Sequence, residues 1–272
     1  MSIFELNENK IKNFMQRIIN FFGFRLTRYL SVAPIELDRI TKHLTKNPEP
    51  IIFDVGASLG LYIENYKKMF EKKTIHSFEP IASEAHVLKE KYKNEKNVFI
   101  NNCAVGEKEG NVEFNITANS RMSSFKDLIP NTTWLKKFSK IAKVDDRNYI
   151  TKKISTKVIT LDDYAEKNNI KNIDILKIDT QGYEDKVLLG AKNLLKNNRI
   201  KVIQLEIIFS EIYENPLQIY DVEKILIPNN YKLFGIENNG SLMSNYIFQT
   251  DLIYVSLDTY ERYKSNSPYF NN

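Results

Sequence analysis

Four acidic side chains lie at or near the ends of short apolar runs that have the length of buried strands. They are Asp54, Glu79, Asp179 and Glu206. Carboxylates of this kind can accept a proton from a hydroxyl group, hold a divalent cation or bind ribose hydroxyls. If the runs are parallel strands, their carboxyl ends meet at one edge of a sheet, and the four carboxylates share one site.

A glycine turn follows the first of these runs, residues 51–55. Gly56 and Gly60 allow a sharp bend and a close approach of the backbone to a ligand. A dinucleotide fingerprint needs a second glycine where Ser58 stands, so the turn argues against NAD. Glu79, at the end of the next run, is placed to accept hydrogen bonds from ribose hydroxyls. A cofactor with adenosine but no pyrophosphate, such as S-adenosylmethionine, therefore fits better.

From residue 50 onward, short apolar runs alternate with helical segments, which is typical of βαβ units and a parallel sheet. The predicted strands are 51–55, 74–78, 98–101, 173–178, 202–208, 231–236 and 252–255. The predicted helices are 61–70, 81–92, 183–195 and 216–227, the last opened by Pro216. Asn238-Asn239-Gly240 predicts a hairpin turn, which makes the final pair of strands antiparallel.

The alternation of predicted strands and helices is interrupted between the third and the fourth of these strands. Two added strands are predicted at 112–116 and 157–160, and residues 117–153 between them are polar and rich in lysine. Trp134 and Phe138 are isolated apolar anchors in that segment. A long loop in a compact domain is usually functional or disordered, so we expect either a substrate lid or a solvated charged loop.

Several motifs, taken in order, resemble those of FkbM-type S-adenosylmethionine-dependent methyltransferases. The first is Phe53-Asp54-Val55-Gly56-Ala57-Ser58-Leu59-Gly60-Leu61-Tyr62, where the family usually has Asn in place of Ser58. The others are Phe78-Glu79-Pro80, Asn102-Cys103-Ala104-Val105-Gly106, Ser123-Ser124, Leu176-Lys177-Ile178-Asp179-Thr180-Gln181-Gly182-Tyr183-Glu184, Gln204-Leu205-Glu206 and Tyr213-Glu214-Asn215-Pro216. Each motif alone is a weak indication of the family, whereas the occurrence of all of them in this order is a specific one.

The resemblance implies an α/β fold of the class I methyltransferase type. This is a Rossmann-like, doubly wound sheet of seven strands with the last antiparallel, which agrees with the pattern of strands and helices. The methyltransferase domain would cover residues 48–260, with a lid or insertion at 117–153. Residues 1–47 would form an N-terminal helical extension, and residues 261–272 a C-terminal tail.

The resemblance also implies the residues of the site. The cofactor site would comprise Asp54, Gly56, Ala57, Ser58, Gly60 and Tyr62 around the methionine end, Glu79 and Pro80 at the ribose, and Asn102, Cys103 and Ala104 beside the adenine. The substrate site would comprise Ser123, Ser124 and Gln181. Family members mostly methylate hydroxyls of sugars, polyketides or other small products, so we expect O-methylation of a sugar, glycan or natural product.

Transfer to a hydroxyl needs help in removing its proton, because a neutral hydroxyl is a weak nucleophile. We expect Asp179 to act as base or orienter at the reacting centre, and Glu206 to support it or bind substrate. A divalent metal held by both carboxylates is an alternative, since hard oxygen ligands suit Mg²⁺. In a second alternative, Asp179 only shapes the cofactor pocket.

Two other functions compete with methyl transfer. An NAD-type oxidoreductase is disfavoured by Ser58, which breaks the dinucleotide fingerprint. A non-catalytic nucleotide-binding module is disfavoured by the presence of both Glu79 and Asp179.

The composition of the 272-residue chain limits the cellular locations and the partners that we expect for it. Its one cysteine, Cys103, cannot form an internal disulfide, which predicts a reducing, cytoplasmic location. No apolar run reaches the ~18 residues that a membrane span needs. We do not expect nucleic-acid binding, because the sequence has no arginine patch and no recognisable nucleic-acid-binding module. Residues 1–30 predict an amphipathic helix, packed on the domain or in contact with a membrane surface or partner.

Overall fold

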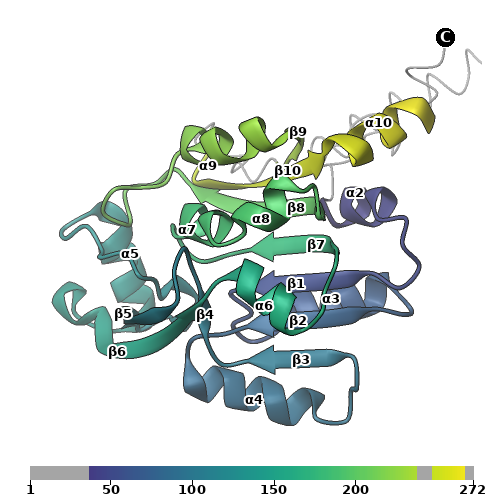
Figure 1. Cartoon of the computed structure of the whole chain (residues 1–272). Coiled ribbons are helices and arrows are strands. Elements are labelled where there is room, and N and C mark those ends of the chain that lie inside the picture. The colour runs from purple at the N-terminus through teal and green to yellow at the C-terminus, as the bar shows by residue number, and fades with distance from the viewer. Residues whose placement is uncertain (1–36, 238–246, 267–272) are drawn as a thin grey trace, which may run out of the picture. The chain divides into compact units, whose positions relative to one another are not determined.

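The computed structural model describes residues 37–237 and 247–266 (Figure 1). The chain divides into a unit of residues Met1–Glu36 and a larger unit, Leu37–Asn272, which contains every described element. The predicted helix and membrane contact within residues 1–30, and the predicted turn at Asn238-Asn239-Gly240, lie outside the described residues. In the part that is described, no helix is long and apolar enough to cross a membrane.

The larger unit is built on a seven-stranded sheet with the order β3-β2-β1-β7-β8-β10-β9 (Figure 1). Its strands are β1 (Ile51–Val55), β2 (Thr74–Phe78), β3 (Val98–Asn101), β7 (Ile173–Ile178), β8 (Ile200–Ile208), β9 (Tyr231–Ile236) and β10 (Gln249–Ser256). The pairs from β3 through β8 are parallel, whereas β10 is antiparallel to both β8 and β9. The predicted doubly wound sheet with an antiparallel last strand is confirmed.

Helices cover both faces of this sheet. They are α2 (Leu37–Leu44), α3 (Leu61–Met69), α4 (Ala82–Tyr92), α6 (Leu161–Lys167), α7 (Glu184–Leu189), α8 (Lys192–Lys196), α9 (Ile219–Leu226) and α10 (Leu257–Asn266). Phe53 and Val55 point into a core shared with α6 to α9, while Ile52 points into a second core with α3 and α4. Strands buried on both faces explain why the sequence shows continuous apolar runs rather than alternation.

The insertion between β3 and β7 forms a second, three-stranded sheet with the order β4-β6-β5. Its elements are β4 (Ala104–Val105), β5 (Gly110–Thr117), η1 (Ser120–Met122), α5 (Thr133–Ala142), η2 (Asp146–Asn148) and β6 (Ile150–Ile159). The prediction of one long loop over 117–153 is therefore wrong. Thr132 caps α5, and Leu135 packs into a core with Ile208 and Ile212 of the main domain.

Two predicted helices have different bounds in the structure. The helix predicted over 183–195 is divided into α7 and α8, and Gly190 at the end of α7 packs against the carbonyl of Gly106 at a distance that admits no Cβ. Pro216 does not open α9. That helix begins at Ile219, where the side chains of Gln218 and Asp221 form a capping box. The helix α10 extends to Asn266, into the segment expected to be a tail.

Candidate functional site

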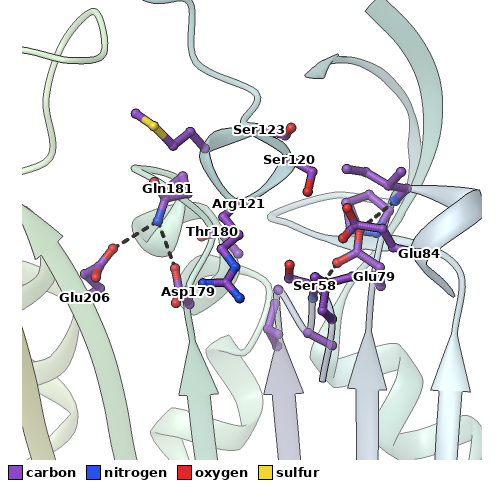
Figure 2. A pocket seen from close by; sticks show the side chains of 18 of the residues that line it. Ser58, Glu79, Glu84, Ser120, Arg121, Ser123, Asp179, Thr180, Gln181 and Glu206 are labelled. Atoms are coloured by element: carbon purple, nitrogen blue, oxygen red, sulfur yellow. Dashed lines mark hydrogen bonds between the residues drawn. The ribbon is translucent and has the colours of Figure 1, made fainter. Parts of the chain in front are cut away.

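A cavity of about 480 Å³ lies between the carboxyl ends of the parallel strands and the insertion (Figure 2). This volume is within the usual range for a small-molecule site. The sequence-predicted residues that line it are Gly56, Ala57, Ser58, Tyr62, Glu79, Pro80, Ala104, Ser123, Asp179, Gln181 and Glu206. The structure thus brings the ends of β1, β2, β7 and β8 to one site, as the topology requires.

The glycine turn after β1 is held tightly between its neighbours. Gly56 has a φ of 88°, and a Cβ added there would lie 1.9 Å from the carbonyl oxygen of Asp179. The amide groups of Gly56 and Ala57 both donate to the carbonyl of Phe78, at 3.0 and 3.1 Å. Only glycine fits this position, so the turn keeps β1, β2 and β7 in register beside the cavity.

Ser58 occupies the tip of the turn with a φ of 44°, in the left-handed region. Asn adopts this region more readily than most residues, so the backbone at this position would accept the Asn that the sequence motif led us to expect. The Ser58 amide donates to Glu79 Oε2 at 2.8 Å. Its Oγ is buried and has no hydrogen-bond partner among the described residues, although Ser58 lines the cavity. A buried hydroxyl without a partner is suited to a ligand.

Glu79 is fixed by backbone donors on both sides. Its Oε1 accepts from the amide of Ile81 at 2.7 Å, and Oε2 accepts from Ser58. The side chain is 3% exposed, and burial raises its pKa to about 7. Each carboxylate oxygen has a second lone pair, so Glu79 can still accept hydrogen bonds from two ligand hydroxyls.

Asp54 and Gly60 do not line the cavity but support the turn. Asp54 is buried and accepts from the Ser77 hydroxyl at 3.2 Å, and burial raises its pKa to about 7. Gly60, at the N-terminus of α3, has a φ of 81° and packs closely against Leu88 and Tyr92. Both residues therefore lie behind the residues that would contact the methionine end of the cofactor.

Asn102 and Cys103 also lie behind the cavity wall, whereas their neighbour Ala104 lines it. The Asn102 amide group donates to the carbonyls of Glu79 and Pro80, at 2.9 and 3.2 Å. It thereby ties the end of β3 to the end of β2. Cys103 is a buried thiol whose pKa is raised to about 11 by burial.

A single amide bridges the two predicted catalytic carboxylates (Figure 2). Gln181 Nε2 donates to Asp179 Oδ1 and to Glu206 Oε2, both at 3.0 Å. The amide of Gln249 donates to the other oxygen of Glu206, and the Tyr213 hydroxyl lies 3.0 Å from Gln181 Oε1. Burial, reinforced by the nearby charge of Asp179, raises the pKa of Glu206 to about 8.

A buried ion pair lies beside these carboxylates. Lys177 Nζ is 2.8 Å from Asp251 Oδ1 and 4.6 Å from the ring centre of Tyr62. Lys177 is 1% exposed; burial alone would lower its pKa, but Asp179 and Asp251 hold it above its ordinary value. Asp251 also lines the cavity. A lone lysine inside the apolar run 173–178 is the sequence signal that could have pointed to this pair.

The insertion supplies a wall of the cavity that the sequence analysis largely missed. Aromatic and apolar side chains share this wall with polar residues of the η1 turn. The additional lining residues are Phe114, Asn119, Ser120, Arg121, Met122, Phe125 and Phe138, with Ile208, Ile212 and Phe248 from the main domain. The lysines Lys136 and Lys137 of α5 are exposed and are not among the lining residues.

The paired serines have different positions. Ser123 lines the cavity, and its Oγ accepts from the amide of Thr117 at 3.1 Å. Ser124 lies behind the wall, where its Oγ donates to the carbonyl of Gln181 at 2.8 Å and accepts from the amide of Lys126. Ser124 thus fastens the insertion to the turn that carries Asp179 and Gln181.

The carboxylate pair is poorly arranged for a metal ion. The NH₂ group of Gln181 lies between Asp179 and Glu206, where a cation would have to bind. Within residues 37–237 and 247–266, no group of three or more His, Cys, Asp or Glu side chains is placed to hold a metal. The residues present therefore do not fit the Mg²⁺ alternative.

The sheet order, the antiparallel β10 between β8 and β9, and the glycine turn beside acidic strand ends define the class I methyltransferase fold. The chain belongs to the FkbM methyltransferase family, because the family model described as "Methyltransferase FkbM domain" matches residues 54–233. The resemblance seen in the sequence motifs is thereby confirmed.

Three individual proteins illustrate what the chain is similar to. The 2-O-methyltransferase NoeI of Sinorhizobium fredii is 22% identical over 230 residues, which cover 81% of this chain and 88% of that protein. The methyltransferase FkbM from Methylobacillus flagellatus KT is similar in fold, with a TM-score of 0.50 at 14% identity over 76% of this chain. The aligned region spans 44% of that protein's chain. A magnesium protoporphyrin IX methyltransferase from Synechocystis, solved with S-adenosylmethionine bound, has a TM-score of 0.41 at 11% identity, over 81% of this chain and 77% of that one.

Proposed function

We propose that the protein transfers a methyl group from S-adenosylmethionine to a hydroxyl of a sugar, a glycan or another small molecule. The observation that carries this proposal is the meeting of the Gly56 turn, Glu79 and the Asp179–Glu206 pair at one cavity. Membership of the FkbM family supports it, as does the similarity to a protein named a 2-O-methyltransferase.

The cavity suits each part of this cofactor. The turn from Gly56 to Ser58 would hold the methionine end, with the unpartnered Ser58 Oγ as a donor or acceptor. Glu79 would accept hydrogen bonds from the ribose hydroxyls, and Pro80 and Ala104 would border the adenine. When bound, the cofactor supplies an electrophilic methyl group on a sulfonium. Acidic side chains around the cavity favour that positive charge.

We assign removal of the acceptor proton to Glu206 and positioning to Asp179, the reverse of the order expected from the sequence. The backbone of Asp179 packs directly against the Gly56 turn, at the proposed methionine end. Glu206 lies on β8, further from the turn. Its raised pKa makes it a stronger base once ionised, and Gln181 and Gln249 hold its carboxylate in place.

The wall opposite the glycine turn would receive the acceptor. Phe125, Phe138 and Phe248 offer aromatic surface to the cavity, and Ile208 and Ile212 extend it. Such surface packs against the apolar face of a sugar ring or a similar small molecule. Phe138 comes from α5, so the insertion contributes to acceptor recognition as well as to the wall of the site. The free, buried Cys103 supports a reducing, cytoplasmic setting.

A transfer assay tests this function. The protein is incubated with S-adenosylmethionine labelled in its methyl group and with sugar and glycan extracts from cells that lack the gene. We expect mass spectrometry to show products that carry one labelled methyl on oxygen, and E206Q to abolish them. Labelled products that carry the methyl only on nitrogen or carbon would refute O-methylation. An NAD-type oxidoreductase is not favoured, since the family is one of methyltransferases.

A further inference from the structure

Arg121 is the one basic side chain among the residues that line the cavity. It belongs to the η1 turn of the insertion, and in Figure 2 its side chain points toward the strand ends, between Asp179 and Ser58. Five acidic residues line the same cavity: Glu79, Glu84, Asp179, Glu206 and Asp251. One guanidinium among five carboxyl groups indicates a particular role for its positive charge.

The backbone beneath Arg121 is firmly held. The amide of Met122 donates to the carbonyl of Asn119, and that of Ser123 donates to the carbonyl of Ser120. The hydroxyl of Tyr213 lies 2.9 Å from the carbonyl of Met122. The backbone position from which the Arg121 side chain extends is therefore set by the fold of the insertion and its anchorage to the main domain.

The guanidinium itself forms no ion pair or hydrogen bond with any residue that the structure describes, although carboxylates line the same cavity. Arg121 is exposed to the cavity. Arginine has five donors in a planar fork that matches a carboxylate with two parallel bonds. Its geometry thus suits an anionic ligand group that enters the cavity.

Two further groups that can donate a hydrogen bond belong to residues that line the same cavity. Ser58 Oγ has no partner among the described residues, and the N-terminus of α3 has no side-chain cap. The first residues of α3, Leu61 and Tyr62, line the cavity. A helix N-terminus favours negative charge through its free N–H groups and its dipole. Together these groups would favour an anionic ligand group in an otherwise acidic cavity.

We infer that Arg121 binds the α-carboxylate of the methionine end of S-adenosylmethionine. This inference rests on the proposed function and adds to it: the insertion completes the cofactor site rather than serving the acceptor alone. The acidic residues then face the amino and sulfonium groups, and Arg121 with the glycine turn faces the carboxylate. The cofactor would thereby fasten the insertion to the main domain when it binds.

The test compares two cofactors that differ only in this carboxylate: S-adenosylmethionine and decarboxylated S-adenosylmethionine. Calorimetry measures both affinities for the wild type, R121A and R121K. The matched control is R147A, since Arg147 lies on the other short helical turn of the insertion, is exposed and is absent from the cavity wall. Thermal unfolding of all variants without ligand shows whether each is folded.

We expect R121A to weaken S-adenosylmethionine binding by roughly 10- to 100-fold, the usual worth of a hydrogen bond to a charged group. Binding of the decarboxylated cofactor should stay within about twofold, R121K should be intermediate, and R147A should match the wild type. Equal losses for both cofactors, or no loss for either, would overturn the inference while leaving the proposed function intact. If the wild type binds neither cofactor, the proposed function falls and this inference falls with it.

Discussion

At the scale of single residues, Glu206 is the group whose chemistry depends most on its surroundings. It is 7% exposed, and burial raises its pKa to about 8. Without a ligand, much of this side chain is therefore protonated at neutral pH. A bound cation would favour the ionised form, so the cofactor itself prepares the base.

The first prediction concerns the pH dependence of turnover. With limiting S-adenosylmethionine, we expect kcat/KM to rise as pH increases through about 8, because Glu206 must be ionised in the free enzyme to accept a proton. E206Q should lower kcat by roughly 10²- to 10⁴-fold with little change in cofactor affinity. Initial rates across the pH range check this, and a wild-type profile that is flat from pH 6 to 10 would contradict it.

The second prediction concerns Ser58, whose hydroxyl has no partner among the described residues. S58A should leave the free energy of unfolding nearly unchanged, because it removes no hydrogen bond seen in the structure. It should weaken S-adenosylmethionine binding by about 0.5–1.5 kcal/mol, the net worth of one hydrogen bond. Calorimetry and urea unfolding measure the two quantities. Loss of stability with unchanged affinity would show that the hydroxyl serves the fold instead.

At the scale of elements, the glycine turn holds three strand ends together. Gly56 packs on the carbonyl of Asp179, and Gly56 and Ala57 donate to the carbonyl of Phe78. The turn thus couples the cofactor end of β1 to the carboxylate at the end of β7. A change that separates these strands should disturb binding and catalysis together.

The third prediction follows from this packing. G56A should lower the free energy of unfolding by at least ~2 kcal/mol, because the new Cβ meets backbone and the φ of 88° is strained for alanine. The matched control is G110A in β5, where an added Cβ has no heavy atom within 4 Å. Urea unfolding compares the two, and similar stabilities would contradict the structural role of Gly56.

Several elements could be predicted from sequence because their signals are local. The bounds of β1, β2, β3, β7 and β9 agree with the apolar runs, since these runs are short and bounded by turn residues or charges. The helix α5 was missed because its apolar face, with Leu135 and Phe138, is interrupted by lysines and lies in a polar segment. The division between α7 and α8 falls at Gly190, which packs against Gly106, a residue distant in sequence.

The residues of the site also divide into those that local sequence signals predict and those that depend on contacts distant in sequence. Strand-end residues such as Glu79 and Asp179 were predictable, because the topology of a parallel sheet places them at one edge. Arg121 and Phe248 were not, since they reach the cavity only through the folding of the insertion and the approach to β10. Asp54 lies at a strand end but behind the turn, because its side chain faces the core beneath it.

At the scale of the whole molecule, buried acidic side chains gather both in the cavity and behind its wall. Burial raises the pKa of Asp54, Glu79 and Glu184 to about 7 and that of Glu206 to about 8. The buried cation Lys177 offsets part of this charge through Asp251 and Asp179. A folded-state pKa above the unfolded value stabilises the fold below the unfolded pKa, and that contribution is lost as pH rises through the folded value.

The fourth prediction is therefore that the ligand-free protein becomes less stable as pH rises from the ordinary glutamate value of 4.5, and that the loss is complete at about 8. E206Q should remove part of this loss, and its melting temperature above pH 8 should exceed that of the wild type by about 2–4 °C for each kcal/mol gained. Thermal unfolding at acidic and alkaline pH measures the difference. If the melting temperatures of the wild type and E206Q change equally with pH, ionisation of Glu206 does not destabilise the fold.

Whether this cavity takes S-adenosylmethionine is tested most directly by calorimetric titration of the wild-type protein with the cofactor, with its demethylated product and with NAD. We expect one site with roughly micromolar affinity for the first two and no binding of NAD. Binding of NAD, with no binding of S-adenosylmethionine or its product, would contradict it.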